Sequence, residues 1–170
     1  MKRVLLTGMS GTGKSTLIGA LAALGYRAID LDTPEWSEWV RSDGDELDPQ
    51  AHRDSIWSNR DWVWREGRVH RLLSTEDAEI LFAGGTASNQ GKFRARFNHI
   101  ILLSAPESVI VSRLSRRTSN AYGKNPDELA RILLHVQTVE PLIRRTASAE
   151  VDTDAPIDQV LGKILTIVGN

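Results

Sequence analysis

The apolar residues of the chain fall into two kinds of segment, short continuous runs and stripes with helical spacing. Short apolar runs predict buried β-strands, and apolar residues three and four positions apart predict amphipathic helices. The predicted strands cover residues 4–6, 26–32, 78–83, 99–103 and, at an edge, 150–153. The predicted helices cover residues 16–24, 104–117, 125–139 and 154–165. Because strands alternate with helices, the pattern predicts an α/β fold, a three-layer sandwich around a five-stranded parallel sheet with right-handed crossovers.

Several helix ends are predicted from residues that favour helix termini. Ser104 can cap the helix that follows it, with Pro106 in the first turn. Pro141 interrupts the helix that begins near Asn125, because proline lacks the backbone N–H group that the helix needs. The last helix is expected to open at Asp154.

Residues 34–74 interrupt the alternation of strands and helices, because no short apolar run in them resembles a strand. Two helical patterns separated by the acidic loop 43–49 predict a helical, substrate-binding insertion, and all five tryptophans lie within it. Trp57 and Trp64 are seven residues apart, on one face of the second predicted helix. This face either packs into the core or frames an aromatic or sugar-like substrate, for which Trp57 and Arg60 are the predicted contacts.

Length, charge and cysteine content narrow the classes of function. The chain has 170 residues, enough for one compact domain with a core. A net charge of −1 and the lack of a dense basic run argue against nucleic acid or an acidic membrane surface as a partner. The absence of cysteine excludes disulfides, iron–sulfur clusters and thiolate zinc sites. The first apolar run ends at Thr7, too short for a secretory signal or a membrane span, so we expect a cytoplasmic protein.

Residues 8–15, Gly-Met-Ser-Gly-Thr-Gly-Lys-Ser, satisfy every specified position of the phosphate-binding pattern G-x-x-x-x-G-K-[ST]. They lie between a predicted strand and a predicted helix, as a phosphate loop does. Glycines let backbone N–H groups approach the phosphates, and the helix N-terminus adds unpaired N–H groups and positive dipole charge. Lys14 is predicted to reach the β- and γ-phosphates, and Ser15 to ligate Mg²⁺. The predicted nucleotide-binding residues of this segment are Gly8, Gly11, Thr12, Gly13, Lys14, Ser15 and Thr16.

Two further predicted strands end in groups that can serve catalysis. The carboxyl ends of parallel strands share one edge of a sheet, where ligands bind. This edge carries Asp30 and Asp32 after the second strand, and Gly84, Gly85 and Thr86 after the third. One aspartate can hold Mg²⁺ while the other orients or deprotonates an acceptor hydroxyl, as phosphoryl transfer requires. The alternative is a pair of aspartates that form a turn and cap a helix.

Arg113, Arg116 and Arg117 lie on one flank of the predicted helix 104–117, because they are three and four residues apart. Cations that close over phosphates stabilise the charge of the transition state. We therefore expect at least one arginine of this cluster to contact nucleotide. The alternative is a favourable interaction of basic side chains with the negative end of the helix dipole.

With these residues placed, the chain resembles the P-loop small-molecule and nucleoside-monophosphate kinase superfamily, and above all its shikimate and gluconate kinase branch. Asp30-Leu31-Asp32 is similar to the Asp-x-Asp of shikimate kinases, whose first aspartate assists Mg²⁺ and whose second contacts the reacting hydroxyl. Gly84-Gly85-Thr86 is similar to their triple-glycine turn against the acceptor. Residues 113–124 resemble the base of a short lid, and residues 141–145 with residues 151–153 resemble the closing helix and the last strand beside adenine.

The resemblance implies a P-loop NTPase fold, ATP and Mg²⁺, a small-molecule acceptor and a lid at about residues 117–126. The implied catalytic residues are Lys14, Asp32 and Arg117. The implied nucleotide contacts beyond the loop are Arg113, Arg117 and Thr153. The implied acceptor contacts are Asp32, Gly84, Gly85 and Thr86, and the implied metal ligands are Ser15 and Asp30.

Val139 marks a departure from shikimate kinases, which place an arginine two residues before the proline to grip the acceptor carboxylate. The acceptor is therefore left open between another polyol, an aminocyclitol, a nucleoside and a nucleotide. A nucleoside-monophosphate kinase is the alternative enzyme. A nucleotide-dependent switch or binding module is the alternative of another class, although the chain lacks the Asn-Lys-x-Asp and Asp-x-x-Gly motifs of a GTPase. The sequence carries no signal for the oligomeric state.

Overall fold

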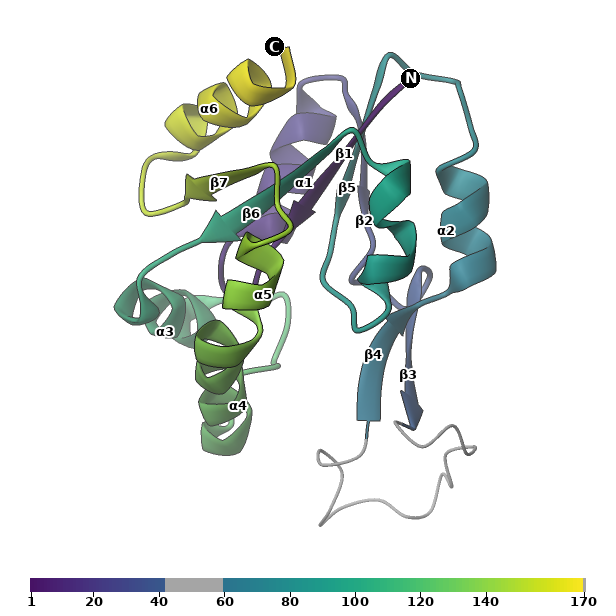
Figure 1. The fold of residues 1–170 in the computed structure, drawn as a ribbon. Coiled ribbons are helices and arrows are strands. Elements are labelled where there is room, and N and C mark those ends of the chain that lie inside the picture. The colour runs from purple at the N-terminus through teal and green to yellow at the C-terminus, as the bar shows by residue number, and fades with distance from the viewer. Residues whose placement is uncertain (42–59, 170) are drawn as a thin grey trace.

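The computed structural model describes residues 1–41 and 60–169, with a five-stranded parallel sheet between layers of helices (Figure 1). The strand order is β2-β5-β1-β6-β7. The strands of this sheet are β1 (Lys2–Thr7), β2 (Arg27–Asp30), β5 (Ile80–Gly84), β6 (His99–Ser104) and β7 (Ala149–Asp152). The helices are α1 (Lys14–Ala23), α2 (Glu66–Leu72), α3 (Glu107–Arg116), α4 (Pro126–Thr138), α5 (Glu140–Arg144) and α6 (Ile157–Gly169), with a 3-10 helix η1 (Gln90–Arg96). The predicted three-layer α/β sandwich is confirmed.

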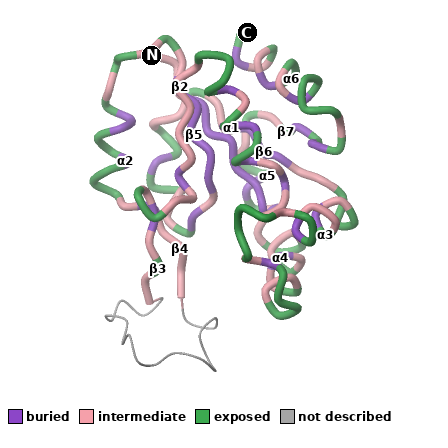
Figure 2. Tube along the Cα trace, turned by 180° about the vertical axis from the view of Figure 1, so that it is seen from behind, coloured by how far each residue is buried: buried purple, intermediate pink, exposed green. Residues whose placement is uncertain are grey.

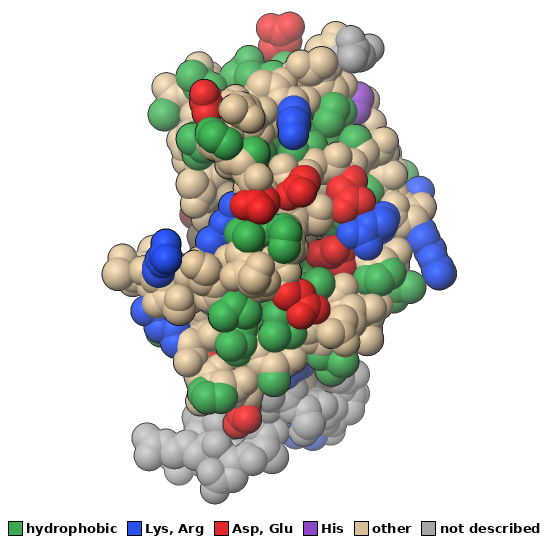
Figure 3. Space-filling view, turned by 90° about the vertical axis from the view of Figure 1, so that its left-hand side faces the viewer, with side chains coloured by type: hydrophobic (Ala, Val, Ile, Leu, Met, Phe, Trp, Pro, Cys, Tyr) green, Lys and Arg blue, Asp and Glu red, His purple; other side chains and the backbone are tan. Residues whose placement is uncertain are grey.

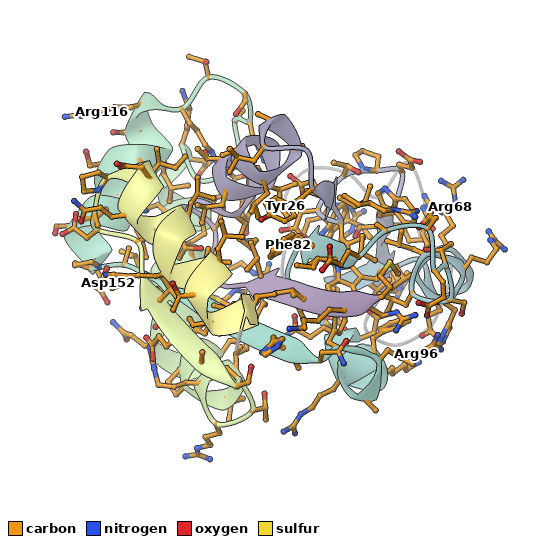
Figure 4. All side chains as sticks on the ribbon, turned by 90° about the horizontal axis from the view of Figure 1, so that it is seen from above. Tyr26, Arg68, Phe82, Arg96, Arg116 and Asp152 are labelled. Atoms are coloured by element: carbon orange, nitrogen blue, oxygen red, sulfur yellow. The ribbon has the colours of Figure 1, made fainter. Side chains whose placement is uncertain are left out.

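Side chains of the central strand β1 alternate between two cores, one on each face of the sheet. Val4 and Leu6 pack with residues of α1 and α6, whereas Leu5 packs with residues of α2 and η1. Figure 2 shows buried residues along the strands and exposed residues on the outer sides of the helices. Tyr26 and Phe82 meet edge to face in the first core, with ring centroids 5.3 Å apart (Figure 4). Burial on both faces explains the continuous apolar runs of these strands.

The prediction of two helices in the insertion is wrong for its described strands. β3 (Ser37–Arg41) and β4 (Arg60–Trp64) form an antiparallel pair that is separate from the main sheet. Trp39 lies opposite Trp62 in this pair, and their ring centroids are 5.0 Å apart. Side chains two residues apart point to the same side of a strand. Trp62 and Trp64 follow this period of two, which the helical interpretation overlooked.

The predicted pairing of Trp57 with Trp64 on a helical face also fails. Trp64 belongs to β4, and its side chain is only 1% exposed because it packs in the core with Phe93. Trp57 and the acidic loop 43–49 lie outside the described residues. Within residues 34–41 and 60–74, α2 is the helical part. The described part of the insertion therefore combines a β-hairpin with one short helix.

Two predicted helix starts differ from the structure, and one predicted break is confirmed. Ser104 ends β6 and does not cap α3, which begins at Glu107. Asp154 lies in a turn, where its N–H group donates to Asp152, and α6 begins only at Ile157. The predicted break near Pro141 is confirmed but falls at Val139, because α4 ends at Thr138 and α5, which begins at Glu140, holds Pro141 in its first turn.

Two global features bear on possible partners. In the described ranges 1–41 and 60–169, no helix is both long enough and apolar enough to cross a membrane. On the face shown in Figure 3, acidic, basic and apolar side chains are interspersed. That face therefore offers no continuous basic surface of the kind that binds nucleic acid.

Candidate active site

The phosphate-binding segment forms a tight loop between β1 and α1. Gly11 and Gly13 have φ angles of 86° and 95°, in the left-handed region that side chains disfavour. A β-carbon at Gly8 would lie 2.3 Å from the carbonyl oxygen of Leu103, so any side chain there would displace the backbone. This backbone path therefore requires glycine at the specified positions of the motif.

The N-terminus of α1 faces the loop without a side-chain cap. Gly13 is the N-cap residue and offers no side-chain acceptor to the first turn. Lys14 begins the helix, and the side chains of Ser15 and Thr16 in the first turn are exposed. Uncapped N–H groups at the positive end of a helix bind anions. The loop and α1 therefore form a site suited to phosphate.

Lys14 directs its ammonium group into the centre of the loop. Its Nζ atom donates hydrogen bonds to the carbonyl oxygens of Gly8 at 2.6 Å and Met9 at 3.3 Å. The same atom lies 3.6 Å from Oδ2 of Asp32. A nearly buried cation is therefore held between the phosphate loop and the end of β2.

Thr86 connects the loop to the end of β2. Its Oγ1 atom donates to the carbonyl oxygen of Gly8 at 2.7 Å and accepts from the N–H group of Gly8 at 3.0 Å. Its own backbone N–H group donates to Oδ1 of Asp32 at 3.0 Å. The three strand ends expected to share one edge therefore meet at Asp32 and Thr86.

Asp30 and Asp32 differ in their surroundings. Asp30 Oδ1 accepts a hydrogen bond from the N–H group of Asp32 at 2.9 Å, which is a turn-forming interaction. Burial raises the pKa of Asp32 above its ordinary value, and the Lys14 charge and a hydrogen bond from Thr86 partly oppose that rise. A carboxylate with a raised pKa is the better proton acceptor. Of the two aspartates, Asp32 has the electrostatic environment of a base.

A cavity of about 1190 Å³ opens beside these groups, between the β3–β4 hairpin and α4 (Figure 1). Its loop wall contains Gly8, Met9, Ser10, Lys14 and Thr86, with Asp32. Its hairpin wall contains Trp39, Arg60, Asp61 and Trp62. Its helical wall contains Tyr122, Glu128, Arg131, His135 and Val139. Ligand pockets are commonly about 300–1,000 Å³, so this space can hold a second small molecule beside a phosphate chain.

The predicted acceptor contacts divide into two groups. Asp32, Arg60 and Thr86 line the cavity, whereas Gly84 and Gly85 are not among the residues that line it. A β-carbon at Gly84 would lie 2.5 Å from a side chain of α1, so this glycine allows β5 to pack against the helix. A β-carbon at Gly85 would lie 3.0 Å from Oδ1 of Asp32. Gly85 therefore makes room for the carboxylate.

Arg113 and Thr153 lie together behind the phosphate loop. Arg113 donates to Oγ1 and to the carbonyl oxygen of Thr153 at 2.9 and 2.7 Å, and to the carbonyl oxygen of Gly11 at 3.4 Å. Thr153 Oγ1 also donates a hydrogen bond of 2.9 Å to the carbonyl oxygen of Thr12, a buried residue. These contacts connect the end of β7 to the loop. The two predicted nucleotide residues are thus adjacent to the phosphate loop but outside the cavity.

Arg117 stabilises the segment 117–126 that follows α3. Its guanidinium donates to the carbonyl oxygens of Asn120, at 3.1 Å, and Tyr122. Gly123 adds a backbone N–H bond to Oε2 of Glu128 at 2.8 Å. Arg117 is half-buried in these contacts and does not line the cavity. The segment itself contributes Asn120 and Tyr122 to the cavity wall.

Comparison with known proteins places this site in a family. Residues 4–134 match the sequence profile of a family described as an AAA domain. The chain belongs to this family. None of the curated proteins matches the chain.

Several solved structures with the same fold are named as kinases. They include shikimate kinase from Acinetobacter baumannii in complex with shikimate, with a TM-score of 0.63 and 21% identity over 99% of this chain and 93% of that one. A gluconokinase from Sinorhizobium meliloti 1021 has a TM-score of 0.55 and 22% identity over 99% and 91% of the two chains. An unliganded sugar kinase from Janibacter sp. HTCC2649 has a TM-score of 0.54 and 19% identity over 98% and 93%. The predicted P-loop NTPase fold is confirmed.

Apart from Arg60, sequence reasoning missed the groups that α4 and β4 bring to this cavity. Glu128, Arg131 and His135 are three and four residues apart, so they lie on one face of α4, and all three line the cavity. This polar stripe beside the apolar stripe of α4 was a signal available in the sequence. Trp62 was missed because β4 was assigned as a helix, although its period of two was also available.

The oxygen atoms beside the loop suit a hard divalent cation. Ser15 offers a hydroxyl group, and Asp30 and Asp32 offer carboxylates, which are ligands that Mg²⁺ prefers. Mg²⁺ usually binds through one or two carboxylates together with substrate phosphates and water, not through a cage of protein ligands. In keeping with that mode, residues 1–41 and 60–169 contain no cluster of three or more His, Cys, Asp or Glu able to hold a metal alone.

Proposed function

We propose that the protein is an ATP-dependent phosphotransferase that moves the γ-phosphate of ATP to a hydroxyl or phosphate group of a small molecule. The observation that carries this proposal is the meeting of Lys14, Asp32 and Thr86 at one end of the large cavity. A nucleotide hydrolase needs space only for a water molecule beside the γ-phosphate. Here the space extends to the hairpin and α4, as an acceptor site would.

In this proposal, the phosphate loop binds the donor. Lys14 neutralises the β- and γ-phosphates, as the lysine of a phosphate loop does. Ser15 and Asp30 position Mg²⁺, which when bound supplies positive charge between these phosphates. Arg113 and Thr153 border the nucleotide behind the loop. Residues 117–126 serve as the lid of a single kinase domain, whose acceptor-binding insertion is at about 34–74.

In the proposed transfer, Asp32 orients the acceptor hydroxyl and accepts its proton. The acceptor oxygen bonds to the γ-phosphorus while the bond from that phosphorus to the β–γ bridging oxygen breaks, and its electron pair leaves on ADP. The products are ADP, the phosphorylated acceptor and a proton that Asp32 returns to solvent. Burial raises the pKa of Asp32, which favours the acceptance of the proton.

The aromatic pair on the hairpin favours a second candidate, a nucleoside-monophosphate kinase. Trp39 and Trp62 both line the cavity, and a nucleobase can stack on an indole ring. The acceptor group would then be a phosphate that is already ionised, so no proton acceptor is required. Replacing Asp32 by asparagine would have a much smaller effect on that reaction than on transfer to a hydroxyl.

A screen for ADP release tests the proposal. The protein is incubated with ATP, Mg²⁺ and, in turn, polyols, aminocyclitols, nucleosides and nucleoside monophosphates. We expect one class to raise ADP release above background, and the Lys14→Ala variant to lower that rate by about 10³-fold because it removes charge from the phosphates. Circular dichroism of the variant controls for folding.

Three results of this screen would decide between the alternatives. Undiminished turnover in Lys14→Ala would contradict the assignment of the donor site. Release only with nucleoside monophosphates would select the second candidate. ATP binding without transfer to any acceptor, with a partner captured in one nucleotide state, would instead favour a nucleotide-dependent switch.

A further inference from the structure

The proposed transfer needs a second cation near the γ-phosphate, and the arginines expected to supply it lie outside the cavity. Kinases and related enzymes commonly use an arginine to stabilise the transferred phosphoryl group. Arg113 is hydrogen-bonded to Thr153, and Arg117 to carbonyl groups of the segment 117–126. Arg116 is exposed and points away from the molecule in Figure 4. None of the three lines the cavity beside Lys14.

Two other arginines line the cavity, Arg60 on the hairpin and Arg131 on α4. A β-carbon at Gly85 would lie 3.3 Å from Nε1 of Trp64 and 3.0 Å from Asp32, so Trp64 marks the end of β4 near the reaction centre. Arg60 lies four residues away at the other end of β4, about 13 Å along an extended strand. Arg60 therefore lies where the far end of an acceptor would bind, not where the γ-phosphate would bind.

Arg131 lies on a part of α4 that packs against α3, which in turn contacts the phosphate loop. Its neighbour Ile132 is buried in a cluster with Ile110 and Leu114 of α3. A β-carbon at Gly11 would lie 3.0 Å from Ile110 and 3.2 Å from Leu114, so these side chains contact the loop directly. Continuous packing therefore fixes α4 at Arg131 relative to the backbone that would hold the phosphates.

A second contact with the loop lies further along α4. Val136 and the C-cap residue Val139 pack against a cluster that includes Met9 of the phosphate loop. Arg131 and His135 line the cavity on the side of α4 between the two anchors. Burial, and to a lesser degree the Arg131 charge, lowers the pKa of His135, so His135 is neutral near pH 7. Arg131 is thus the permanent positive charge of this wall.

From this placement we propose that Arg131 binds the transferred phosphoryl group, and that Arg117 instead holds the lid segment. The inference rests on the proposed phosphotransferase function and adds one catalytic residue to it. As the acceptor oxygen bonds to the γ-phosphorus and the bond to ADP breaks, negative charge spreads over the three equatorial oxygens. A guanidinium group can donate two parallel hydrogen bonds to such oxygens, which an ammonium group cannot match.

The test uses a mimic of the transferred group, so the acceptor need not be known. Affinity for ADP with Mg²⁺ is measured with and without aluminium fluoride, which occupies the position of the γ-phosphoryl group. The wild-type protein is expected to bind ADP more tightly when fluoride is present. Arg131→Gln is expected to reduce this gain by about 100-fold while binding of ADP alone is unchanged, because the guanidinium contacts only the transferred group. Arg131→Lys should retain an intermediate gain.

Two further variants serve as controls. Arg71→Gln removes one positive charge from the exposed side of α2, away from the cavity, and should keep the full gain. Arg117→Gln should speed amide hydrogen exchange at Tyr122, because it releases the segment 117–126, whereas Arg131→Gln should not. The urea midpoint of each variant is measured in parallel, and Arg131→Lys keeps the test valid should glutamine destabilise α4.

Each remaining outcome counts against a specific step. No gain from fluoride in the wild-type protein would overturn the phosphotransferase function and the role of Arg131 together. A wild-type gain that Arg131→Gln retains would overturn only the role of Arg131. Arg117→Gln could instead abolish the fluoride-dependent gain in ADP affinity while amide hydrogen exchange at Tyr122 stays unchanged. That result would assign binding of the transferred phosphoryl group to Arg117.

Discussion

The phosphate loop and the β3–β4 hairpin lie on two sides of one cavity, but different interactions hold them. In the loop, Gly11 and Gly13 adopt left-handed backbone conformations, and Lys14 Nζ donates to the carbonyl oxygen of Gly8. The hairpin depends on the pairing of two strands, with Trp39 opposite Trp62, across residues 42–59 of the chain. The loop is therefore specified by residues that are adjacent in sequence, and the hairpin by segments that are not.

This difference implies unequal tolerance to substitution. A side chain added to the loop meets backbone, which cannot move without disturbing β6. A side chain changed on the hairpin meets the cavity, which has space. We therefore expect the donor side to be intolerant and the hairpin side to control the choice of acceptor. Five predictions on four variants test this contrast, and the variants run from the largest expected effect to the smallest.

Asp32→Asn at the junction of the two walls should have the largest effect. If the acceptor group is a hydroxyl, the transfer rate should fall by about 10²–10⁴-fold, because the proton acceptor is lost. Affinity for ATP should be unchanged. The measurement is the rate of ADP release with the acceptor found in the screen. A fall of less than tenfold would indicate a phosphate acceptor or another base.

The same variant should be at least as stable as the wild type near neutral pH. Burial raises the pKa of Asp32 in the folded state above the ordinary value of 3.8, so the folded state binds more protons than the unfolded state between those two pKa values. The Asp32 contribution to the free energy of unfolding therefore falls as pH rises through this window. Urea unfolding should show a larger advantage of asparagine at about pH 7 than at about pH 4.

Gly8→Ala should be the most destabilising single-methyl change in the loop. The added β-carbon would lie 2.3 Å from the carbonyl oxygen of Leu103, and overpacking of this kind costs about 1–3 kcal/mol. Gly19→Ala in α1 is the matched control, because nothing lies within 4 Å of its β-carbon. That control should raise the free energy of unfolding by up to about 1 kcal/mol, since alanine favours a helix. Equal free energies of unfolding by urea would contradict the close contact.

Thr86→Val should weaken the connection between the loop and Asp32. It removes the hydroxyl that bonds both to N–H and to O of Gly8. The carbonyl oxygen keeps its hydrogen bond from Lys14, but the N–H group loses this acceptor, at a cost of about 1–3 kcal/mol. Thr86→Ser keeps the hydroxyl and should retain most of the stability and the ATP affinity. The free energy of unfolding and the KM for ATP are measured for both variants. A loss in Thr86→Ser as large as that in Thr86→Val would contradict a dominant role of the hydroxyl, because serine lacks only the methyl group.

Trp39→Leu on the hairpin should have the smallest effect on stability. The side chain is 37% exposed, and its contact with Trp62 is worth about 0.5–1.5 kcal/mol as an aromatic pair. We expect an increase in the KM for the acceptor and no change in the KM for ATP. A change confined to the KM for ATP would place the nucleotide, not the acceptor, against the hairpin.

Much of the fold could be predicted from the sequence, but the acceptor wall could not. The strands of the parallel sheet were predicted because strands buried on both faces are short and continuously apolar, as in β1 and β6. β4 was assigned as a helix because its five residues, Arg60–Trp64, show no continuous apolar run. Its charged side chains and Trp62 line the cavity instead of filling a core on both faces. Such a half-exposed strand shows only a weak period of two, which two nearby tryptophans at helical spacing outweighed.

The candidate site divides in the same way. Asp32 and Thr86 were predicted from their positions at strand ends, because parallel strands bring these ends to one edge. Gly84 was predicted to contact the acceptor, but it packs against α1. Arg131 and His135 were not predicted, because their relevance depends on which side of α4 faces the cavity. That orientation depends on packing of Ile132 and Val139 against other elements.

By itself, the sequence determined the phosphate loop, the helix that follows it and the alternation of strands and helices. These features depend on residues a few positions apart, through glycine conformations and hydrophobic periodicity. Only the tertiary structure decided that residues 37–41 pair with 60–64, that Gly84 faces α1, and that α4 brings Arg131 to the cavity. The physical reason is that each of these depends on the packing of segments far apart in the chain, and local conformational preferences do not specify such contacts.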